Sequence, residues 1–207
     1  LFDSVSQIVK SLKFAAEQFN QALTDDDAKS IIGLGLPEVA QVLFPEVPEL
    51  HQAILQSYSE HYVEHSIHDV WFDGVAEMLQ DLAAQGIQLA VATGKSRKGL
   101  DRVLAQTKSH DIFVATRAAS ETKSKPDPLM LSEILSVVGV HHEQAIMVGD
   151  TSYDLEMAQN IRMPSVGVTY GVHDSHVLEK FNPIALASDV TALHQLLNHQ
   201  IKLQESA

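Results

Sequence analysis

Cysteine is absent from the 207 residues of this chain, and glycine and proline are scarce, at 10 and 7 residues. The lack of cysteine excludes disulfides, zinc sites built from cysteine and thiol catalysis, and it fits a reducing compartment. The chain contains no low-complexity segment and no internal repeat, which argues against a fibrous or disordered protein. With 45% hydrophobic residues, the sequence predicts one good core, or one core with a small satellite domain.

Basic residues are few compared with acidic ones, 14 against 27, so the formal net charge is −13. This charge repels nucleic acid and anionic membranes, and we expect neither as a partner. No run of 18 apolar residues occurs and no signal peptide is recognisable, which predicts a soluble, cytoplasmic protein. One local exception is the segment from Lys95 to Lys125, which holds eight of the 14 basic residues and could attract an anionic group. Alternatively, most of these basic residues are ordinary solvent-exposed surface residues.

The first third of the chain has the periodicity of helices. Apolar residues recur at helical spacing over 5–23, which predicts one helix there. Further helices are expected after Thr24, at Pro37 and over 50–65. We therefore predict a helical domain over residues 1–70.

From Gly74 onward, short apolar runs alternate with amphipathic stretches, which is the pattern of βαβ units. Strands are predicted over 87–92, 112–115, 145–148, 165–168 and 184–186. For residues 71–207 we therefore expect an α/β fold, a Rossmann-like parallel sheet with helices on both faces. Ligands of such sheets bind at the carboxyl ends of the strands.

Three polar segments lie just past predicted strands. The Thr93 hydroxyl and the backbone N–H of Gly94 can both donate to a phosphoryl oxygen. The Lys125 ammonium, followed by proline, can neutralise a transferring phosphoryl group. Asp150 and, four residues later, Asp154 offer the hard oxygen ligands that suit Mg²⁺.

Each of these segments also has a purely structural interpretation. Thr93 and Gly94 can form an ordinary turn at a strand end, Lys125 can be an exposed loop residue, and Asp150 can cap a helix. A rival constellation is formed by His61, His65 and His68, which share one helical face and could in principle bind a transition metal. A surface position, or packing between the helical domain and the α/β domain, is the simpler explanation of these histidines.

Taken in order, these segments resemble a known family. A strand ending in Thr93, the pair Lys125-Pro126, and Gly149-Asp150 with Asp154 resemble the second, third and fourth motifs of the haloacid-dehalogenase-like superfamily. The resemblance runs across nearly the whole chain and implies that the helical segment is an inserted cap domain. Its phosphoglycolate-phosphatase-like branch is the most similar, through the segments 91–95, 125–129 and 164–168.

The first motif of that family, Asp-x-Asp-Gly-Thr on the central strand, is not present in the sequence, which opens with residues that resemble the tail of that motif. We therefore expect roughly ten to fifteen preceding residues, enough for one strand and a turn. Without a central strand, two buried neighbouring strands keep unpaired backbone groups, each of which costs on the order of 1 to 3 kcal/mol. A smaller departure is Arg162, where the family usually has a glycine at the end of a helix. It predicts a different cap or local strain.

The resemblance implies a chemistry and a role for each motif residue. An aspartate of the first motif attacks phosphorus, and water hydrolyses the resulting aspartyl-phosphate. Mg²⁺ is held by Asp150 with Asp154, and Asp154 orients either the metal shell or Lys125. Thr93 and Gly94 bind the phosphoryl oxygens, and Lys125 balances the developing charge. The expected substrate is a small phosphorylated metabolite such as 2-phosphoglycolate, selected by the cap, and the expected state is a monomer or homodimer.

Two alternative functions, different from that of a phosphatase, remain. Without a nucleophile, the chain can be an inactive binding or structural homologue. It can also be another enzyme of the same superfamily, namely a phosphomutase, a pyrophosphatase or a dehalogenase, of which the dehalogenases need no magnesium.

Overall fold

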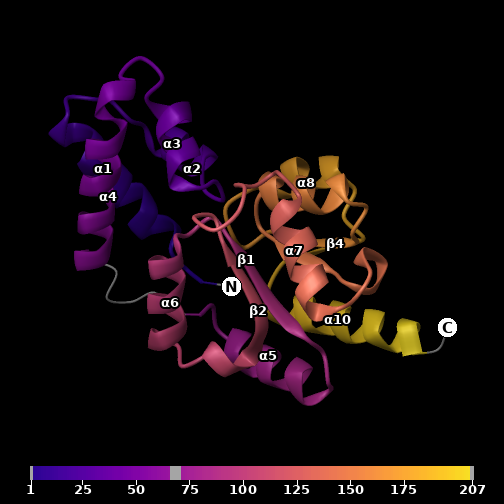
Figure 1. Cartoon of the computed structure of the whole chain (residues 1–207). Coiled ribbons are helices and arrows are strands. Elements are labelled where there is room, and N and C mark those ends of the chain that lie inside the picture. The colour runs from indigo at the N-terminus through magenta and orange to yellow at the C-terminus, as the bar shows by residue number, and fades with distance from the viewer. Residues whose placement is uncertain (1, 66–70, 206–207) are drawn as a thin grey trace.

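The computed structural model describes residues 2–65 and 71–205 and has a helical part and an α/β part (Figure 1). The helical part comprises α1 (Val5–Gln18), α2 (Asp25–Ser30), α3 (Leu36–Leu43), the short 3₁₀ helix η1 (Pro48–Leu50) and α4 (His51–His65). The predicted domain limit after residue 70 adjoins residues 66–70, which lie outside the described residues, so this limit stays a prediction.

The core of the helical part forms where α1 packs against α4 and α2. Leu12 of α1, Ile31 after α2 and Ile54 of α4 are almost fully buried there. Burial of such side chains stabilises the fold by about 1.5–3 kcal/mol each. The amphipathic pattern that predicts these helices therefore follows from the face that each helix buries.

The first helix is shorter than its pattern predicts. It ends at Gln18, because Asn20 adopts a left-handed conformation with φ of 55°. Phe19 and Leu23, which extend the apolar pattern beyond the helix, pack into the same core from the following loop. A side chain in a loop can thus continue the spacing of a helix without being helical.

The α/β part alternates helices and strands as predicted. Its principal elements are α5 (Val75–Ala84), β1 (Leu89–Thr93), α6 (Arg97–Gln106), β2 (Phe113–Ala118), α7 (Leu129–Val138), β3 (Met147–Gly149), α8 (Ser152–Asn160), β4 (Ser165–Val168), α9 (Ser175–Leu178), β5 (Ala185–Ala187) and α10 (Val190–Glu205). Three 3₁₀ helices, η2 (His110–Ile112), η3 (His142–Gln144) and η4 (Glu179–Phe181), join them.

Helices cover both faces of the strands. Val91 of β1 packs in a cluster with Leu100 and Leu104 of α6, whereas its neighbour Ala92 packs in a cluster with Met130 of α7. Since consecutive residues of a strand point to opposite faces, α6 and α7 cover opposite faces of the β1–β2 pair (Figure 1). The predicted α/β architecture with helices on both faces is confirmed.

All strand pairs are parallel, but the described strands form two separate sheets. One consists of β1 and β2, and the other has the order β3-β4-β5. Neither β1 nor β3 has a strand partner on its second edge within the described residues, and residues of both strands line one cavity of about 940 Å³. A central strand is what the family resemblance implies, and it stays a prediction.

The end of α8 shows the strain that its sequence predicts. Arg162 adopts the left-handed conformation, with φ of 58°, directly after this helix. Glycine takes this conformation without steric cost, whereas a side chain disfavours it by roughly 1 kcal/mol or more. The prediction of local strain at Arg162 is confirmed.

Candidate active site

Lys125 and Asp154 form a buried ion pair at the carboxyl end of β1. The Lys125 Nζ atom lies 2.5 Å from Asp154 Oδ1 and donates a second hydrogen bond, of 3.0 Å, to the carbonyl oxygen of Ala92. Only 6% of the lysine side chain and 7% of the aspartate side chain are exposed. The interpretation of Lys125 as an exposed loop residue is therefore wrong, because the loop folds it back onto the strand ends.

Asp154 is fixed on its other side by Thr151, the residue that caps α8. The Thr151 hydroxyl donates to Asp154 Oδ2 at 2.7 Å and accepts from the Asp154 backbone N–H, a reciprocal capping box. A side chain at Gly149 would overlap Asp154, so this glycine allows the close approach of strand and helix. Both carboxylate oxygens of Asp154 are thus occupied by protein groups.

Asp150 follows directly after β3 and lines the cavity. Its Oδ2 atom accepts the backbone N–H of Val172 at 3.0 Å. Burial raises the pKa of the Asp150 carboxyl group, and the nearby charge of Asp154 raises it further. Since Thr151 and not Asp150 is the N-cap of α8, the helix-cap interpretation of Asp150 is wrong.

Thr93 and Gly94 lie at the end of β1, next to the ion pair. The Thr93 hydroxyl accepts the backbone N–H of Lys95 at 3.2 Å. A Cβ atom at Gly94 would lie 2.5 Å from the carbonyl oxygen of Leu34 and 2.6 Å from that of Gly33. The glycine is therefore required for the loop between α2 and α3 to contact the strand end.

Two hydrogen bonds hold the helical part over this site. The backbone N–H of Gly35 donates to Ser124 Oγ at 2.8 Å, and Tyr153 Oη donates to the carbonyl oxygen of Ser30 at 2.9 Å. The first bond joins the α2–α3 region to the loop that carries Lys125, and the second joins it to the first turn of α8, which carries Asp154. The helical part therefore contacts the α/β part next to the strand ends.

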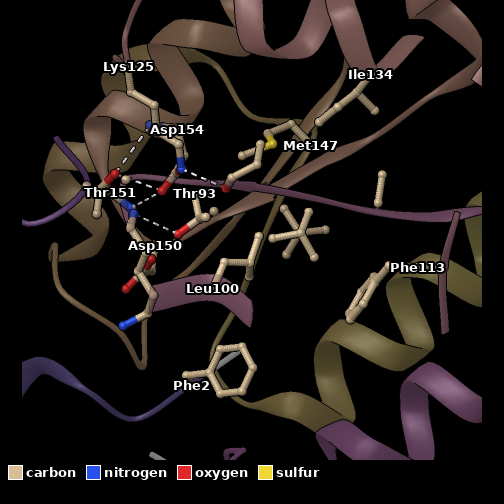
Figure 2. Close-up of a pocket in the computed structure, with 18 of the residues that line it drawn as sticks. Phe2, Thr93, Leu100, Phe113, Lys125, Ile134, Met147, Asp150, Thr151 and Asp154 are labelled. Atoms are coloured by element: carbon tan, nitrogen blue, oxygen red, sulfur yellow. Dashed lines mark hydrogen bonds and ion pairs between the residues drawn. The ribbon is translucent and has the colours of Figure 1, made fainter. Parts of the chain in front are cut away.

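The residues predicted from the three polar segments thus meet at one end of the cavity. Figure 2 shows Thr93, Lys125, Asp150 and Asp154 close together, whereas apolar side chains such as Leu100 and Ile134 surround the remainder. The strands end at the same edge because they are parallel, so their following loops converge. A compact cation, a hydroxyl and carboxylates side by side form a site suited to an anion and a metal ion.

Two residues of the site were not predicted from the sequence. The backbone N–H of Ser152 donates to His173 Nδ1 at 2.9 Å, and burial lowers the pKa of this histidine. Tyr170 also lines the cavity, and burial raises its pKa to about 12. Its hydroxyl is buried, and no described residue is a hydrogen-bond partner for it. Both residues lie in an irregular segment after β4, where no periodicity or motif marks them.

The histidines of α4 pack against aromatic groups. His61 stacks on Phe14 and on His65, and its Nδ1 lies 3.0 Å from Ser11 Oγ. His68 lies outside the described residues. Within residues 2–65 and 71–205, no group of three or more His, Cys, Asp or Glu residues is arranged to hold a metal ion. For His61 and His65, packing is the observed role.

The sequence pattern of the haloacid dehalogenase-like hydrolases matches residues 1–168 of the chain. The chain belongs to this family. The helical part, described over residues 2–65, is the segment that the resemblance predicts to be an inserted cap.

Named relatives of the chain are phosphatases. It is 35% identical to a phosphoglycolate phosphatase of Thiobacillus denitrificans over 126 residues. The matched segment covers 60% of this chain and 56% of that protein. A pyrophosphatase PpaX of Halalkalibacterium halodurans is 30% identical over 164 residues. This match covers 76% of this chain and 73% of the pyrophosphatase. With a phosphoglycolate phosphatase of Psychrobacter arcticus the match spans 54% of the relative. The chain thus matches about half the length of two of these relatives.

The fold is shared with solved structures. A hydrolase from Pseudomonas syringae superposes with a TM-score of 0.86 over 96% of this chain and 94% of its own, at 20% sequence identity. At this identity the similarity establishes the fold alone. In the part of the chain that the structure describes, no helix combines the length and apolar character needed to cross a membrane.

Proposed function

We propose that this chain carries the active site of a magnesium-dependent phosphatase that hydrolyses a small phosphomonoester resembling phosphoglycolate. The observation that carries the proposal is the convergence of Thr93, Lys125 and Asp150 at one end of the cavity. The names of the related phosphoglycolate phosphatases and pyrophosphatase support a phosphate ester or anhydride as the substrate.

Each polar group has a proposed task. The Thr93 hydroxyl and the Gly94 N–H bind phosphoryl oxygens, and the Lys125 ammonium balances the negative charge that develops during transfer. Asp154 holds the ammonium in place, since it forms a buried ion pair with it and is itself fixed by Thr151. The cap seated over the strand ends excludes water and contacts the leaving group.

The residues fit a magnesium ion with Asp150 as the direct ligand. The Asp150 carboxylate lines the cavity. Burial and the charge of Asp154 both disfavour the ionised form of Asp150, and a bound cation would offset this effect. Mg²⁺ binds through one or two carboxylates and keeps several waters, so a large protein cage is not needed. Because both oxygens of Asp154 are engaged, we propose that Asp154 acts through Lys125. When bound, the ion supplies polarisation of the phosphoryl oxygens.

The nucleophile is proposed to come from an extended segment that pairs between β1 and β3. Two observations support this part of the proposal. Within the described residues, β1 has no strand partner on the edge opposite β2, and β3 has none on the edge opposite β4. Residues of both strands also line the same cavity. A parallel strand placed there would end beside Asp150 and Lys125. An aspartate at that end could attack phosphorus, and water would then hydrolyse the aspartyl-phosphate.

Hydrolysis of p-nitrophenyl phosphate tests the proposal. The protein is assayed alone and with a strand-forming segment that carries Asp-x-Asp, each with Mg²⁺ and with EDTA. We expect turnover that requires the segment and is lost with EDTA. Turnover that is indifferent to EDTA would indicate a metal-independent enzyme, and absence of turnover under all conditions would favour a binding protein.

The Asp150→Asn variant tests the metal ligand. We expect the magnesium-dependent turnover to fall by roughly 100-fold or more, since the charge that holds the ion is removed while the side-chain shape is kept. Circular dichroism should show an unchanged fold. The matched control is Asp174→Asn, which neutralises an exposed carboxylate nearby and should leave turnover unchanged. Near-normal turnover of Asp150→Asn would show that the metal lies elsewhere.

A further inference from the structure

The segment after β4 packs closely around Asp150, the proposed metal ligand. The backbone N–H of Val172 donates to Asp150 Oδ2 at 3.0 Å, and the backbone N–H of His173 donates to the Asp150 carbonyl oxygen at 3.0 Å. A side chain at Gly171 would overlap the Asp150 carboxylate, so the backbone of this segment passes directly against it. Three consecutive residues, 171–173, therefore contact a single aspartate.

His173 attaches this segment to a second element of the site. Its Nδ1 atom accepts the backbone N–H of Ser152, the first residue of α8, at 2.9 Å. The first N–H groups of a helix have no partner within the helix, so the imidazole satisfies a donor that α8 leaves unpaired. Burial lowers the pKa of His173, which favours the neutral ring whose Nδ1 can accept. The segment is thus held at Asp150 and at Ser152, on either side of Thr151.

These contacts engage one carboxylate oxygen of Asp150. Oδ2 accepts the Val172 N–H, whereas no hydrogen bond to Oδ1 occurs among the described residues. In contrast, both carboxylate oxygens of Asp154 accept hydrogen bonds from protein groups. The orientation of the Asp150 carboxylate therefore depends on the segment after β4.

We propose that His173 is a positioning residue for Asp150. It holds the Val172 N–H against Oδ2 and thereby fixes the carboxylate in the orientation in which Oδ1 remains for the metal ion. Gly171 permits the same close approach, because a side chain at this position would occupy the place of the carboxylate. The inference rests on the proposed function for the metal, whereas the contact between residues 171–173 and Asp150 is independent of it.

A double-mutant cycle tests the contact without any metal. Gly171→Ala should lower the urea midpoint of unfolding, because the added methyl group meets the Asp150 side chain. In an Asp150→Gly background the same substitution should lower the midpoint much less, since the group that it meets is gone. Gly99→Ala on α6, where a Cβ atom meets only ordinary contacts, is the matched control and should act equally in both backgrounds. Equal shifts for Gly171→Ala in both backgrounds would overturn the contact.

Hydrogen exchange tests the role of His173. In the wild-type protein we expect the amides of Ser152 and Val172 to be protected. In His173→Ala the Val172 amide should lose this protection while amides in the middle of α8 keep theirs, because the segment is no longer attached to the helix. His173→Asn retains a hydrogen-bond acceptor close to the place of Nδ1 and should restore most of the protection. His176→Ala removes an exposed imidazole of the same region and should change neither amide.

A role of His173 as a helix cap alone makes a different prediction. Loss of such a cap would destabilise α8 and expose the Ser152 amide, but the Val172 amide would stay protected. Protection of Val172 in His173→Ala therefore overturns the positioning role, as does fast exchange of Val172 in the folded wild-type protein. The wild-type measurement and the Gly171 cycle decide the question if His173→Ala does not fold.

Titration calorimetry with Mg²⁺ connects the segment to the metal. The folded variants are titrated in the presence of the Asp-x-Asp segment used in the activity test. Loss of a group that orients a metal ligand weakens binding by about 10–100-fold, so we expect a loss of at least about tenfold in His173→Ala and affinity close to that of the wild type in His173→Asn. His176→Ala should bind as the wild-type protein does.

The outcomes separate this inference from the proposed function. Binding of Mg²⁺ by the wild-type protein with unchanged affinity in His173→Ala overturns the positioning role, while the phosphatase proposal stands. Absence of Mg²⁺ binding by the wild-type protein overturns the magnesium dependence of the proposed function, and the role of His173 toward the metal with it.

Discussion

At the scale of single residues, the site depends on one buried charge pair. Lys125 and Asp154 are nearly inaccessible to water, and each is the main neutralising charge of the other. Removal of one partner of a buried pair is costly because the other charge stays buried without compensation. The loop lysine Lys123, two residues away, pairs with Asp127 but is 68% exposed.

The two lysines therefore provide a matched comparison. We expect Lys125→Met to lower the free energy of unfolding by about 3–5 kcal/mol, whereas Lys123→Met should change it by at most about 1 kcal/mol. Urea unfolding measures both. Similar losses in the two variants would mean that the Lys125–Asp154 pair is solvated in solution.

At the scale of elements, the same capping box starts two helices in different surroundings. Thr24 and Asp27 begin α2 at an exposed position, whereas Thr151 and Asp154 begin α8 in the buried site. Both threonines accept a backbone N–H and both aspartates reach back to the threonine N–H. Only the second box also fixes a residue that holds Lys125.

Valine in place of each threonine isolates the effect of burial. Thr24→Val should cost about 1 kcal/mol, the usual value of an N-cap. Thr151→Val should cost roughly 1–3 kcal/mol more, because it removes one of the two donors to a buried oxygen of Asp154 and leaves the Thr151 backbone N–H as the other. Urea unfolding of the two variants gives the difference. Equal costs would show that the hydroxyl of Thr151 acts only as a helix cap.

At the scale of the whole molecule, the described strands form two separate sheets, and this division leaves strand edges without partners within the described residues. Within the described residues, β1 and β3 each have one strand neighbour and face the cavity, whereas β4 is paired on both sides. The strand β5 is also an edge, but it lies at the outer side of its sheet. Inner and outer edges can therefore be compared in one protein.

Hydrogen exchange should reveal the strand proposed between β1 and β3. When a segment with an apolar run followed by Asp-x-Asp is added, we expect amides of β1 and β3 to become protected, because their free N–H groups gain partners. The outer edge β5 should be unaffected and serves as the internal control. Protection of β5 to the same extent, or no change at β1 and β3, would contradict the proposal.

The sequence alone determined the order of elements and the position of the polar segments. Periodicity and turn residues depend on near neighbours in the chain. This explains why the α/β alternation, the helices of the first third and the positions of Thr93 and Asp150 at strand ends were predictable. The end of α1 was not, because a loop continued its apolar spacing after Asn20 had turned the chain.

Only the tertiary structure decided which of these residues meet. Lys125 and Asp154 are 29 positions apart, and Lys95 and Tyr62 are 33 apart. Contacts at such separations are set by how helices and strands pack, and no local pattern encodes them. For the same reason the burial of Lys125 and the division of the described strands into two sheets appear only once the chain is folded.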